Sequence, residues 1–415
     1  MKYRNFFSYF IFFSLAGCAY LDKPVSVRDW AANIESFFNI DEETVDFVKK
    51  VSSQVLWSTD IGKARSYRTT ALQPAYNDGN IYTIDKNGLI HSINSSDGDE
   101  NWSYNLNLDV TSGISFHNGH LFFGTHDGKI YGYDIDRLKL SNNNFFDNLN
   151  VINLLDTETL DPDMMIELTS EVSAPITGMD EKIFVRLSDG DTLAINYESS
   201  SIIWQYQGRN VPLNIKGSGS ISTSFNNIFV ARDDGTLISL SHDSGKLNWL
   251  TSISPRSGRN ELESLRDVEM TPLLDDGIVF VGSYQGSLIA VDSLTGTLIW
   301  STPMSVRSNL DTDEYNIYVA TEDGSIFALD KYTGNIVWKS NVNSKLFLTQ
   351  SIVYENYIAT LSTLGHIVIV DRNTGNLLSL QELISPIDYQ SRFLIIDKIL
   401  YIVTKNGRLN SIKIN

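Results

Sequence analysis

The feature that most limits how this chain can fold is a short pattern that recurs along most of its length. The clearest copy covers residues 316–338, where two apolar runs flank the turn Asp323-Gly324 and a second turn at Gly334 leads to Trp338. An Asp-Gly pair between two strand-like runs predicts a β-hairpin, with a type I′ turn because both central residues then need positive φ. This copy therefore predicts three antiparallel strands.

Eight copies align on the glycine of the first turn. In a complete copy the second turn comes ten residues after this glycine, and a tryptophan comes fourteen residues after it. A period of roughly 40 residues with several short strands is typical of the blades of a β-propeller. The first-turn glycines are Gly88, Gly128, Gly190, Gly235, Gly286, Gly324, Gly365 and Gly407. The tryptophans at the matching position are Trp102, Trp204, Trp249, Trp300 and Trp338.

Some copies depart from the pattern. The second copy is degenerate, with Leu138 and Asn142 at the positions of the second-turn glycine and the tryptophan. Ser200 replaces the second-turn glycine of the third copy, and Ser379 stands at the tryptophan position of the seventh. Where the tryptophan is present, we expect its large flat side chain to wedge between successive blades.

The two ends of the chain complement each other. Residues 54–58, with Trp57, resemble the tryptophan strand of a copy without its earlier strands, whereas the last copy ends before such a strand. We predict that the N-terminal strand completes the last blade and closes the ring, which leaves no long exposed strand edge. The predicted fold is an all-β, eight-bladed β-propeller of four-stranded antiparallel blades. Its strands read as continuous apolar runs, as expected for sheets covered on both faces.

The N-terminus resembles a bacterial lipoprotein signal. A basic start and an apolar run at 6–13, too short to span a bilayer, precede Leu15-Ala16-Gly17 and Cys18, the only cysteine of the chain. In such signals the cysteine is lipidated and the leader is cut before it. By the family sorting rule, Ala19 after the cysteine implies anchoring in the outer membrane with the domain facing the periplasm. The predicted regions are a signal peptide at 1–17, a lipidated tether at 18–53 and the propeller at 54–415.

Charge and motifs narrow the classes of function. The net charge is −18, and it becomes −20 without Lys2 and Arg4 of the leader, since 30 basic residues (32 less two) then face 50 acidic ones. Such acidity repels phosphate backbones, so we expect no nucleic-acid partner. The chain has no phosphate-binding loop, nucleophile elbow or zinc-ligand spacing. We therefore expect no catalytic residue, no metal and no cofactor.

Three histidines lie close together in the sequence of the second blade. His117, His120 and His126 surround one predicted strand. We expect strand geometry and a turn to spread their side chains, so that they form no metal site.

Three segments between predicted strands are unusually long. One is an insertion at 141–171 in blade two, which is either a tolerated surface excursion or part of a binding face. The other two, at 208–220 and 254–269, precede and follow blade four, and carry apolar or basic residues on an otherwise acidic chain. Insertions in repeat proteins fall on loops at one face, often the binding face. We expect the two connections beside blade four to lie close together on one rim.

The repeats resemble those of pyrroloquinoline-quinone dehydrogenases over roughly residues 54–415. Those enzymes hold calcium with carboxylates and often have a cysteine pair beside the quinone, whereas this chain has no second cysteine. The lipoprotein signal, short tether and eight blades together are more similar to the BamB family. These are propeller lipoproteins of the outer-membrane β-barrel assembly machinery. The resemblance implies a non-catalytic scaffold.

In the BamB family, a Leu-x-Leu-Arg-Gly loop and an Asp-Val-Asp-x-x-Pro segment contact the POTRA domains of the central barrel subunit. The matching stretches here read LNIKG at 213–217 and DVEMTP at 267–272. Lysine in place of arginine loses a planar donor fork, and glutamate replaces the second aspartate. The resemblance implies apolar anchors and charged contacts that set orientation. The anchors are Leu213 and Ile215, and the charged contacts are Lys216, Asp267 and Glu269.

The predicted function is to assist the folding and insertion of β-barrel outer-membrane proteins. The expected partners are the POTRA domains and unfolded outer-membrane proteins, which strand addition could hold. Two alternatives stay open. A periplasmic ligand-binding propeller would show a pocket lined by aromatic and convergent polar groups. A quinone-dependent dehydrogenase would reduce a dye once calcium and the quinone are added.

Overall fold

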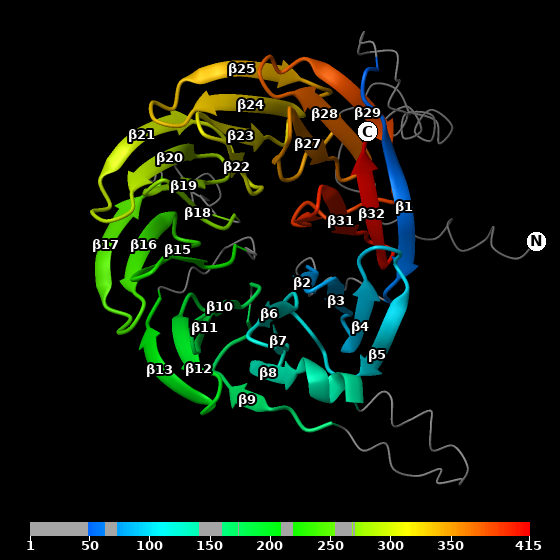
Figure 1. Ribbon diagram of the computed structural model, residues 1–415. Coiled ribbons are helices and arrows are strands. Elements are labelled where there is room, and N and C mark those ends of the chain that lie inside the picture. The colour runs from blue at the N-terminus through cyan, green and yellow to red at the C-terminus, as the bar shows by residue number, and fades with distance from the viewer. Residues whose placement is uncertain are drawn as a thin grey trace, which may run out of the picture. The chain divides into compact units, whose positions relative to one another are not determined.

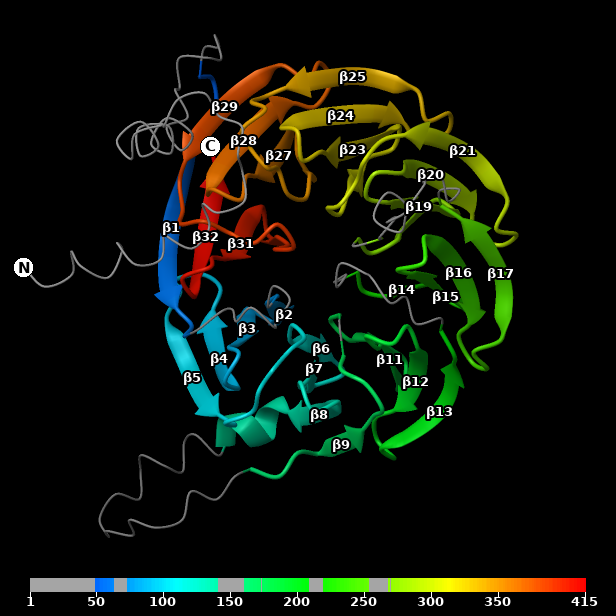
Figure 2. The same ribbon diagram turned by 180° about the vertical axis from the view of Figure 1, so that it is seen from behind.

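The computed structural model describes residues 49–62, 73–140, 160–172, 174–208, 219–253, 268 and 270–415. Over these residues the chain forms eight four-stranded sheets of antiparallel strands. Figure 1 shows them as blades around a ring, with the first strand of each blade toward the centre and the fourth at the rim; Figure 2 gives the view from behind. The prediction of an eight-bladed β-propeller is confirmed.

In blades one to seven the four strands follow one another in sequence. The strands of blades one to four are β2 (Ala75–Asn77), β3 (Asn80–Ile84), β4 (Leu89–Asn94), β5 (Glu100–Asn105), β6 (Ser115–His117), β7 (His120–Gly124), β8 (Lys129–Asp134), β9 (Met164–Glu167), β10 (Thr177–Met179), β11 (Lys182–Arg186), β12 (Thr192–Asn196), β13 (Ser201–Tyr206), β14 (Ser222–Thr223), β15 (Asn227–Ala231), β16 (Thr236–Ser241) and β17 (Leu247–Ser252). The strands of blades five to eight are β18 (Leu273–Asp275), β19 (Ile278–Gly282), β20 (Ser287–Asp292), β21 (Leu298–Pro303), β22 (Asp311–Thr312), β23 (Asn316–Ala320), β24 (Ser325–Asp330), β25 (Ile336–Asn341), β26 (Ile352–Tyr354), β27 (Tyr357–Leu361), β28 (His366–Asp371), β29 (Leu377–Glu382), β30 (Leu394–Ile396), β31 (Ile399–Val403), β32 (Arg408–Ile414) and β1 (Ser53–Asp60).

Blade eight contains both ends of the described propeller. β1 pairs antiparallel with β32, so the N-terminal strand supplies the fourth strand of this blade. Trp57 lies opposite Ser411, and the N–H of Asn415 donates to the carbonyl of Ser52 at 2.8 Å. The predicted closure of the ring is confirmed. Because the closing strands come from opposite ends of the chain, the ring can form only after both ends are available.

The apolar runs of the sequence are buried because other blades cover both faces of each sheet. In β23, Ile317 and Tyr318 are 0% exposed, and Val319 and Ala320 are 1% exposed. One core cluster contains Phe280 of blade five together with buried residues of blades four and six. The core is therefore distributed over the interfaces between blades, as continuous apolar strands require.

Tryptophans of the repeat pack against the next blade of the ring. The indole of Trp300 in blade five lies on Gly334 of blade six, where an added Cβ would be 2.5 Å from the indole ring. The indole N–H of Trp300 donates to the carbonyl of Lys331 at 3.0 Å. The predicted wedge between blades is confirmed, and it leaves no room for a side chain at the second turn. The same contact joins Trp57 to Gly98, Trp204 to Gly245, Trp249 to Gly296 and Trp338 to Gly375.

Blade seven has no tryptophan at the repeat position, and blade eight has no second turn on which such a tryptophan could pack. Ser379 stands at the tryptophan position, and in blade eight the C-terminal residue and the residues before β1 lie where a turn between β32 and β1 would be. Residues before β1 cover this rim instead. The N–H of Lys50 donates to the carbonyl of Leu378 at 3.0 Å, and Val51 shares a core cluster with Leu378. The serine therefore marks the seam where the ring closes.

Blade two is completed after its long insertion. Its fourth strand, β9, lies within the span 141–171 that the sequence assigned to the insertion, so that assignment is wrong at its C-terminal part. Met164 of β9 lies opposite Gly132 at the position that tryptophan holds in other blades, and it is 2% exposed. The strand was missed because it carries no tryptophan. Residues 141–159 lie outside the described part of the chain.

The second turns of blades two and three also differ. In blade two a helical turn at 135–140 takes this place, and Leu138 is fully buried in the cluster that contains Trp102. In blade three Ser200 occupies the glycine position with a φ of 51°. The preceding blade has Met164 instead of a tryptophan, so no indole requires a glycine there.

The first turns are not the type I′ turns that the Asp-Gly pairs predict. At Asp323-Gly324 only the glycine has positive φ, 75°, and its N–H donates to the carbonyl of Thr321 at 3.2 Å. The hydroxyl of Thr321 donates to the Asp323 carboxylate at 2.6 Å. This arrangement is a type I turn followed by a left-handed glycine. Turns with two positive φ values lie at the other end of the blades, as at Asp276-Gly277, with 49° and 75°.

Candidate partner-binding site

The predicted partner-binding residues lie on two connections outside the described residues. Leu213, Ile215 and Lys216 belong to the connection between β13 and β14, and Asp267 and Glu269 belong to that between β17 and β18. The described residues at the ends of each connection show where the two connections begin and end.

Both connections start at the same face of the ring. In an antiparallel blade, the chain leaves the fourth strand at the end where the second and third strands turn. The N–H of Gly208 donates to Asp191 at 2.7 Å, next to the turn at Gly190. In blade four the N–H of Ile253 donates to the carbonyl of Gly235, in the corresponding turn, at 2.9 Å. We call this the connection face; the opposite face, which carries the turns before the second and fourth strands, is the turn face.

The two connections end beside each other. The N–H of Ser220, at the end of the first connection, donates to the hydroxyl of Thr271, at the end of the second, at 2.9 Å. The N–H of Thr271 donates to Asn309 at 2.9 Å. Val268 and Met270 are 0% and 1% exposed, so they anchor the end of the second connection in the core. These bonds bring the ends of the two connections to one place on the connection face.

Arg186, the last residue of β11, ties blade three to blade four at the connection face. Its guanidinium pairs with Asp233 in the turn between β15 and β16, and it donates to the carbonyl of Gly219 at 3.4 Å. The side chains of Arg186 and Asp233 are 3% and 12% exposed. A charge pair removed from water needs further hydrogen bonds to satisfy its atoms, and Gly219 supplies one. The first connection thus ends beside a buried ion pair.

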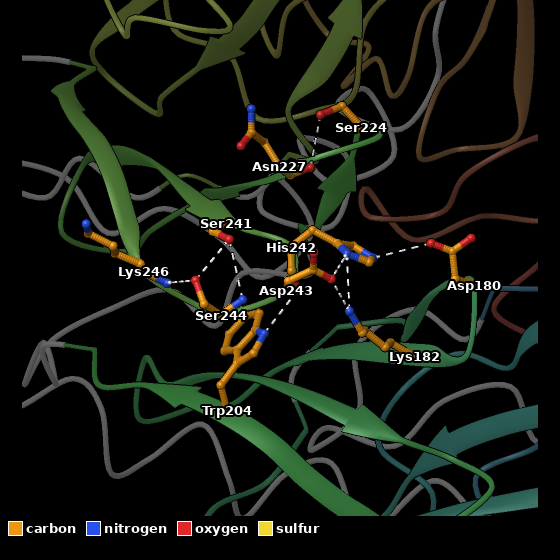
Figure 3. Close-up of polar contacts among 10 residues, drawn as sticks. All are labelled: Asp180, Lys182, Trp204, Ser224, Asn227, Ser241, His242, Asp243, Ser244 and Lys246. Atoms are coloured by element: carbon orange, nitrogen blue, oxygen red, sulfur yellow. Dashed lines mark hydrogen bonds and ion pairs between the residues drawn. The ribbon is translucent and has the colours of Figure 1, made fainter.

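Lys182, the first residue of β11, ties the same two blades at the turn face (Figure 3). Its ammonium donates to Asp243 at 2.5 Å, and Nδ1 of His242 lies 3.1 Å from the same oxygen. The hydrogen bond from Lys182, followed by that from His242, holds the pKa of the Asp243 carboxyl below its usual range. The carbonyl of His242 accepts the indole N–H of Trp204 at 3.0 Å. β11 therefore links blade three to blade four at both ends, which keeps the borders of the first connection fixed.

Arg186 and Lys182 were not identified from the sequence. For Arg186 a signal exists: the last residue of the second strand is small or apolar in other blades, such as Ala231 and Gly282, and arginine stands out once the blades are aligned. Lys182 gives no comparable signal, because the first residue of the second strand is polar in several blades, as at Asn227.

Two of the three clustered histidines come together, contrary to expectation. His117 and His120 lie opposite each other in the β6–β7 hairpin because they flank its two-residue turn. Both rings lie near Tyr197, at centroid distances of 6.0 and 5.5 Å. His126 lies elsewhere, 3.7 Å from Glu171. Within the described ranges, no group of three or more His, Cys, Asp or Glu side chains is placed to hold a metal ion.

The predicted lipidation residue, Cys18, lies outside the described residues with the rest of 1–48. In the part of the chain that the structure does cover, none of the helical segments has the length and apolar character needed to pass through a membrane. The signal peptide, the tether and the lipid anchor therefore stay predictions.

The closed ring, its repeats and its tryptophan–glycine contacts define an eight-bladed β-propeller built from quinoprotein-like repeats. The family model described as outer membrane protein assembly factor BamB matches residues 41–141 and 151–340. The chain belongs to the BamB family.

Individual relatives are similar over most of the chain. The outer membrane protein assembly factor BamB of Shewanella oneidensis is 23% identical, over 89% of this chain and 92% of its own length. The crystal structure of BamB from Moraxella catarrhalis matches with a TM-score of 0.73 and 20% identity, covering 87% of this chain and 100% of that one. A quinohemoprotein alcohol dehydrogenase from Comamonas testosteroni matches with a TM-score of 0.60 and 11% identity, covering 87% and 76%. At these identities the two structures show a shared fold alone.

Proposed function

We propose that this protein is a non-catalytic scaffold lipoprotein that assists the folding and insertion of β-barrel proteins into the outer membrane. Membership of the BamB family carries this proposal, since the family model covers residues 41–141 and 151–340. A relative similar over nearly its full length bears the name of an assembly factor. In this proposal a lipid on Cys18 holds the propeller at the periplasmic face of the outer membrane.

The proposed partner is the central barrel subunit, contacted through its POTRA domains. Leu213 and Ile215 act as apolar anchors, while Lys216, Asp267 and Glu269 orient the complex and raise the association rate. Two observations support this placement. The hydrogen bond between Ser220 and Thr271 joins the ends of the two connections, and the Arg186–Asp233 pair fixes the blades beside them. A border that is rigid before binding lowers the entropy lost on association.

Unfolded outer-membrane proteins are a second proposed partner, held at the rim of the ring. The rim strands of blades three to six are the last in their sheets, and they carry exposed apolar side chains. Such edges suit the addition of an extended strand. These side chains include Ile202, Leu250, Leu298 and Ile336, which are 45%, 50%, 49% and 52% exposed.

The decisive experiment is co-purification of the native lipoprotein with the barrel subunit from detergent-solubilised membranes. We expect Leu213→Asp with Ile215→Asp to abolish capture of the barrel subunit, because two charges replace the apolar anchors. The matched control is Phe225→Asp with Leu294→Asp, which places two charges on exposed residues of the turn face. Unchanged capture by the first variant, or equal loss in the control, would refute the proposed contact.

The absence of catalysis is tested separately. Purified protein is mixed with calcium, pyrroloquinoline quinone and a redox dye, and alcohols or sugars are added. We expect no dye reduction above that of the mixture without protein. Reduction that depends on the protein would favour a dehydrogenase and contradict the scaffold proposal.

A further inference from the structure

The turn face carries large apolar side chains that are well exposed. Phe225, in the turn before the second strand of blade four, is 86% exposed, and Leu294, in the turn before the fourth strand of blade five, is 76% exposed. In blade six, Tyr315 in the turn before the second strand is 62% exposed, and Tyr332 in the turn before the fourth strand is 47% exposed. At the equivalent turns of blades one, three, seven and eight, the exposed residues described are polar. Apart from Leu140 at the end of the helical turn in blade two, which is 62% exposed, the large exposed apolar residues of the described turns thus lie on blades four to six.

Contacts between blades bring these residues together. On the turn face, the turn before the second strand of one blade lies against the turn before the fourth strand of the next. The hydroxyl of Tyr332 donates to Asp276 of blade five at 3.1 Å, and Asp180 of blade three lies 3.8 Å from His242 of blade four in the same relation. The repeat therefore places Phe225 of blade four beside Leu294 of blade five.

A negatively charged pocket, lined in part by Tyr332, lies between blades five and six. Its volume is about 390 Å³, and four carboxylates and one ammonium line it together with Tyr332. The ammonium of Lys331 forms an ion pair with the carboxylate of Asp275, with 2.5 Å between Nζ and Oδ2. The pocket as a whole keeps an excess of negative charge. The carboxylates belong to Asp275, Asp276, Asp313 and Glu314.

We propose that this part of the turn face binds a basic, extended segment of a partner protein whose lysine or arginine side chains are interspersed with apolar ones. The carboxylates attract the cations, and Tyr315 and Tyr332 offer ring faces to them. Phe225 and Leu294 provide apolar contacts further along the same segment. Anionic lipid, nucleic acid and a second copy of this acidic chain would each bring like charge to the pocket.

This inference does not rest on the proposed function. The connection face and the turn face are opposite ends of the same blades. A chain that holds the barrel subunit at one face could therefore hold a basic segment at the other at the same time. The two contacts can be removed independently, because no residue belongs to both.

The test uses a short dye-labelled peptide of repeating Lys-Phe-Lys-Ser units, with a Glu-Phe-Glu-Ser peptide as the charge control. Fluorescence anisotropy measures binding to the full chain in low salt. We expect the lysine peptide to bind and the glutamate peptide not to bind. We also expect affinity to fall as salt is raised, because exposed charges are screened. Absence of binding by the lysine peptide would overturn the proposal.

Paired variants then locate the site. We expect Asp276→Asn with Glu314→Gln to weaken binding about tenfold, and Phe225→Ser with Leu294→Ser to weaken it by about the same factor. The matched control is Asp97→Asn with Glu198→Gln, which removes one exposed aspartate and one exposed glutamate from turns of blades one and three. We expect the control to weaken binding less than about twofold. Equal weakening by the control would mean that the peptide senses only the overall charge.

Two further measurements keep the outcomes distinct. Melting curves of all variants should be close to that of the parent, since every changed residue lies in an exposed turn. Capture of the barrel subunit should be unchanged in the Asp276→Asn, Glu314→Gln variant, so failure here differs from failure of the proposed function. If the chain instead self-associates through this face and the Phe225→Ser, Leu294→Ser variant abolishes it, the occupant is a second copy and the proposal is wrong.

Discussion

Trp300 of blade five lies on Gly334 of blade six, with its indole N–H bonded to the carbonyl of Lys331 three residues earlier. This relation joins two elements of the repeat that belong to different blades. The glycine is needed because the indole occupies the space of a side chain, and the hydrogen bond fixes the height at which the blades meet. The repeat therefore encodes the contact between neighbours as well as the strands of each blade.

The first prediction compares two glycines with similar backbone conformations. Gly334 and Gly277 have φ values of 70° and 75°, but a Cβ at Gly334 would be 2.5 Å from Trp300, whereas a Cβ at Gly277 would meet nothing within 4 Å. We expect Gly277→Ala to cost about 1–2 kcal/mol from the left-handed backbone alone. Gly334→Ala should cost about 1–3 kcal/mol more because the indole must move. Urea unfolding of both variants measures the difference, and equal costs would contradict the role of the indole.

The second prediction concerns the tryptophan itself. Trp338 is 9% exposed, lies on Gly375 and donates to the carbonyl of Arg372 at 2.9 Å. We expect Trp338→Ala to lower the stability by about 3–5 kcal/mol, because it leaves a cavity between blades six and seven. Thermal melting measures the loss, with Tyr315→Ala as an exposed aromatic control. A melting curve like that of the parent would show that the indole does not hold the blades together.

The third prediction separates the two cations of β11. Arg186 and Asp233 form a buried pair, whereas the partner of Lys182, Asp243, has a side chain that is 84% exposed. We expect Arg186→Met to cost about 3–5 kcal/mol, because it removes the cation that pairs with a buried carboxylate. Lys182→Met should cost only about 0–1 kcal/mol.

A double variant provides the control for this comparison. Adding Asp233→Asn to Arg186→Met also removes the buried carboxylate charge, so part of the lost stability should return. Chemical unfolding of the single and double variants gives the coupling energy. If the double variant loses the sum of both single losses, the pair does not act as a unit.

The fourth prediction concerns the pH dependence of the stability that one ion pair contributes between blades five and six. Burial alone would raise the pKa of Asp275, but hydrogen bonds from Lys331 and Thr312 outweigh it and lower this pKa. Burial alone would lower the pKa of Lys331, but the hydrogen bond and charge of Asp275 outweigh it and raise this pKa. Both shifts favour the charged forms in the folded state, so the pair stabilises the fold when both groups are ionised.

The signs of these shifts fix the pH window. The contribution of Asp275 is present above the unfolded carboxyl pKa of about 3.9 and is lost as the pH falls through the folded-state value. That of Lys331 is present below about pH 10.4 and is lost as the pH rises through its folded-state value. We expect Lys331→Met to lower the melting temperature between about pH 4 and 10, with a smaller difference at more acidic pH. A difference that stays constant in acid would exclude this linkage.

Much of the fold could be read from the spacing of a few residue types. Glycines and tryptophans at fixed intervals gave eight blades, and Trp57 near the start indicated which strand closes the ring. The fourth strand of blade two was missed because Met164 carries no such mark, and the turn at Asp323 was assigned the wrong type. In that turn a side-chain hydrogen bond from Thr321 accompanies the type I geometry, which an Asp-Gly pair alone does not reveal.

The sequence by itself determined the number of blades, the closure of the ring and the family resemblance. The number of blades follows from short-range periodicity, and the closure follows from the single tryptophan strand near the N-terminus together with the incomplete last copy. Only the tertiary structure showed that a tryptophan and the glycine it needs belong to neighbouring blades. It also showed that Arg186 and Lys182 link blades three and four at both faces of the ring. Finally, it placed Phe225 and Leu294 on the face opposite the connections. These relations join residues tens of positions apart. Their geometry exists only once the blades pack around the ring, so no local pattern could contain it.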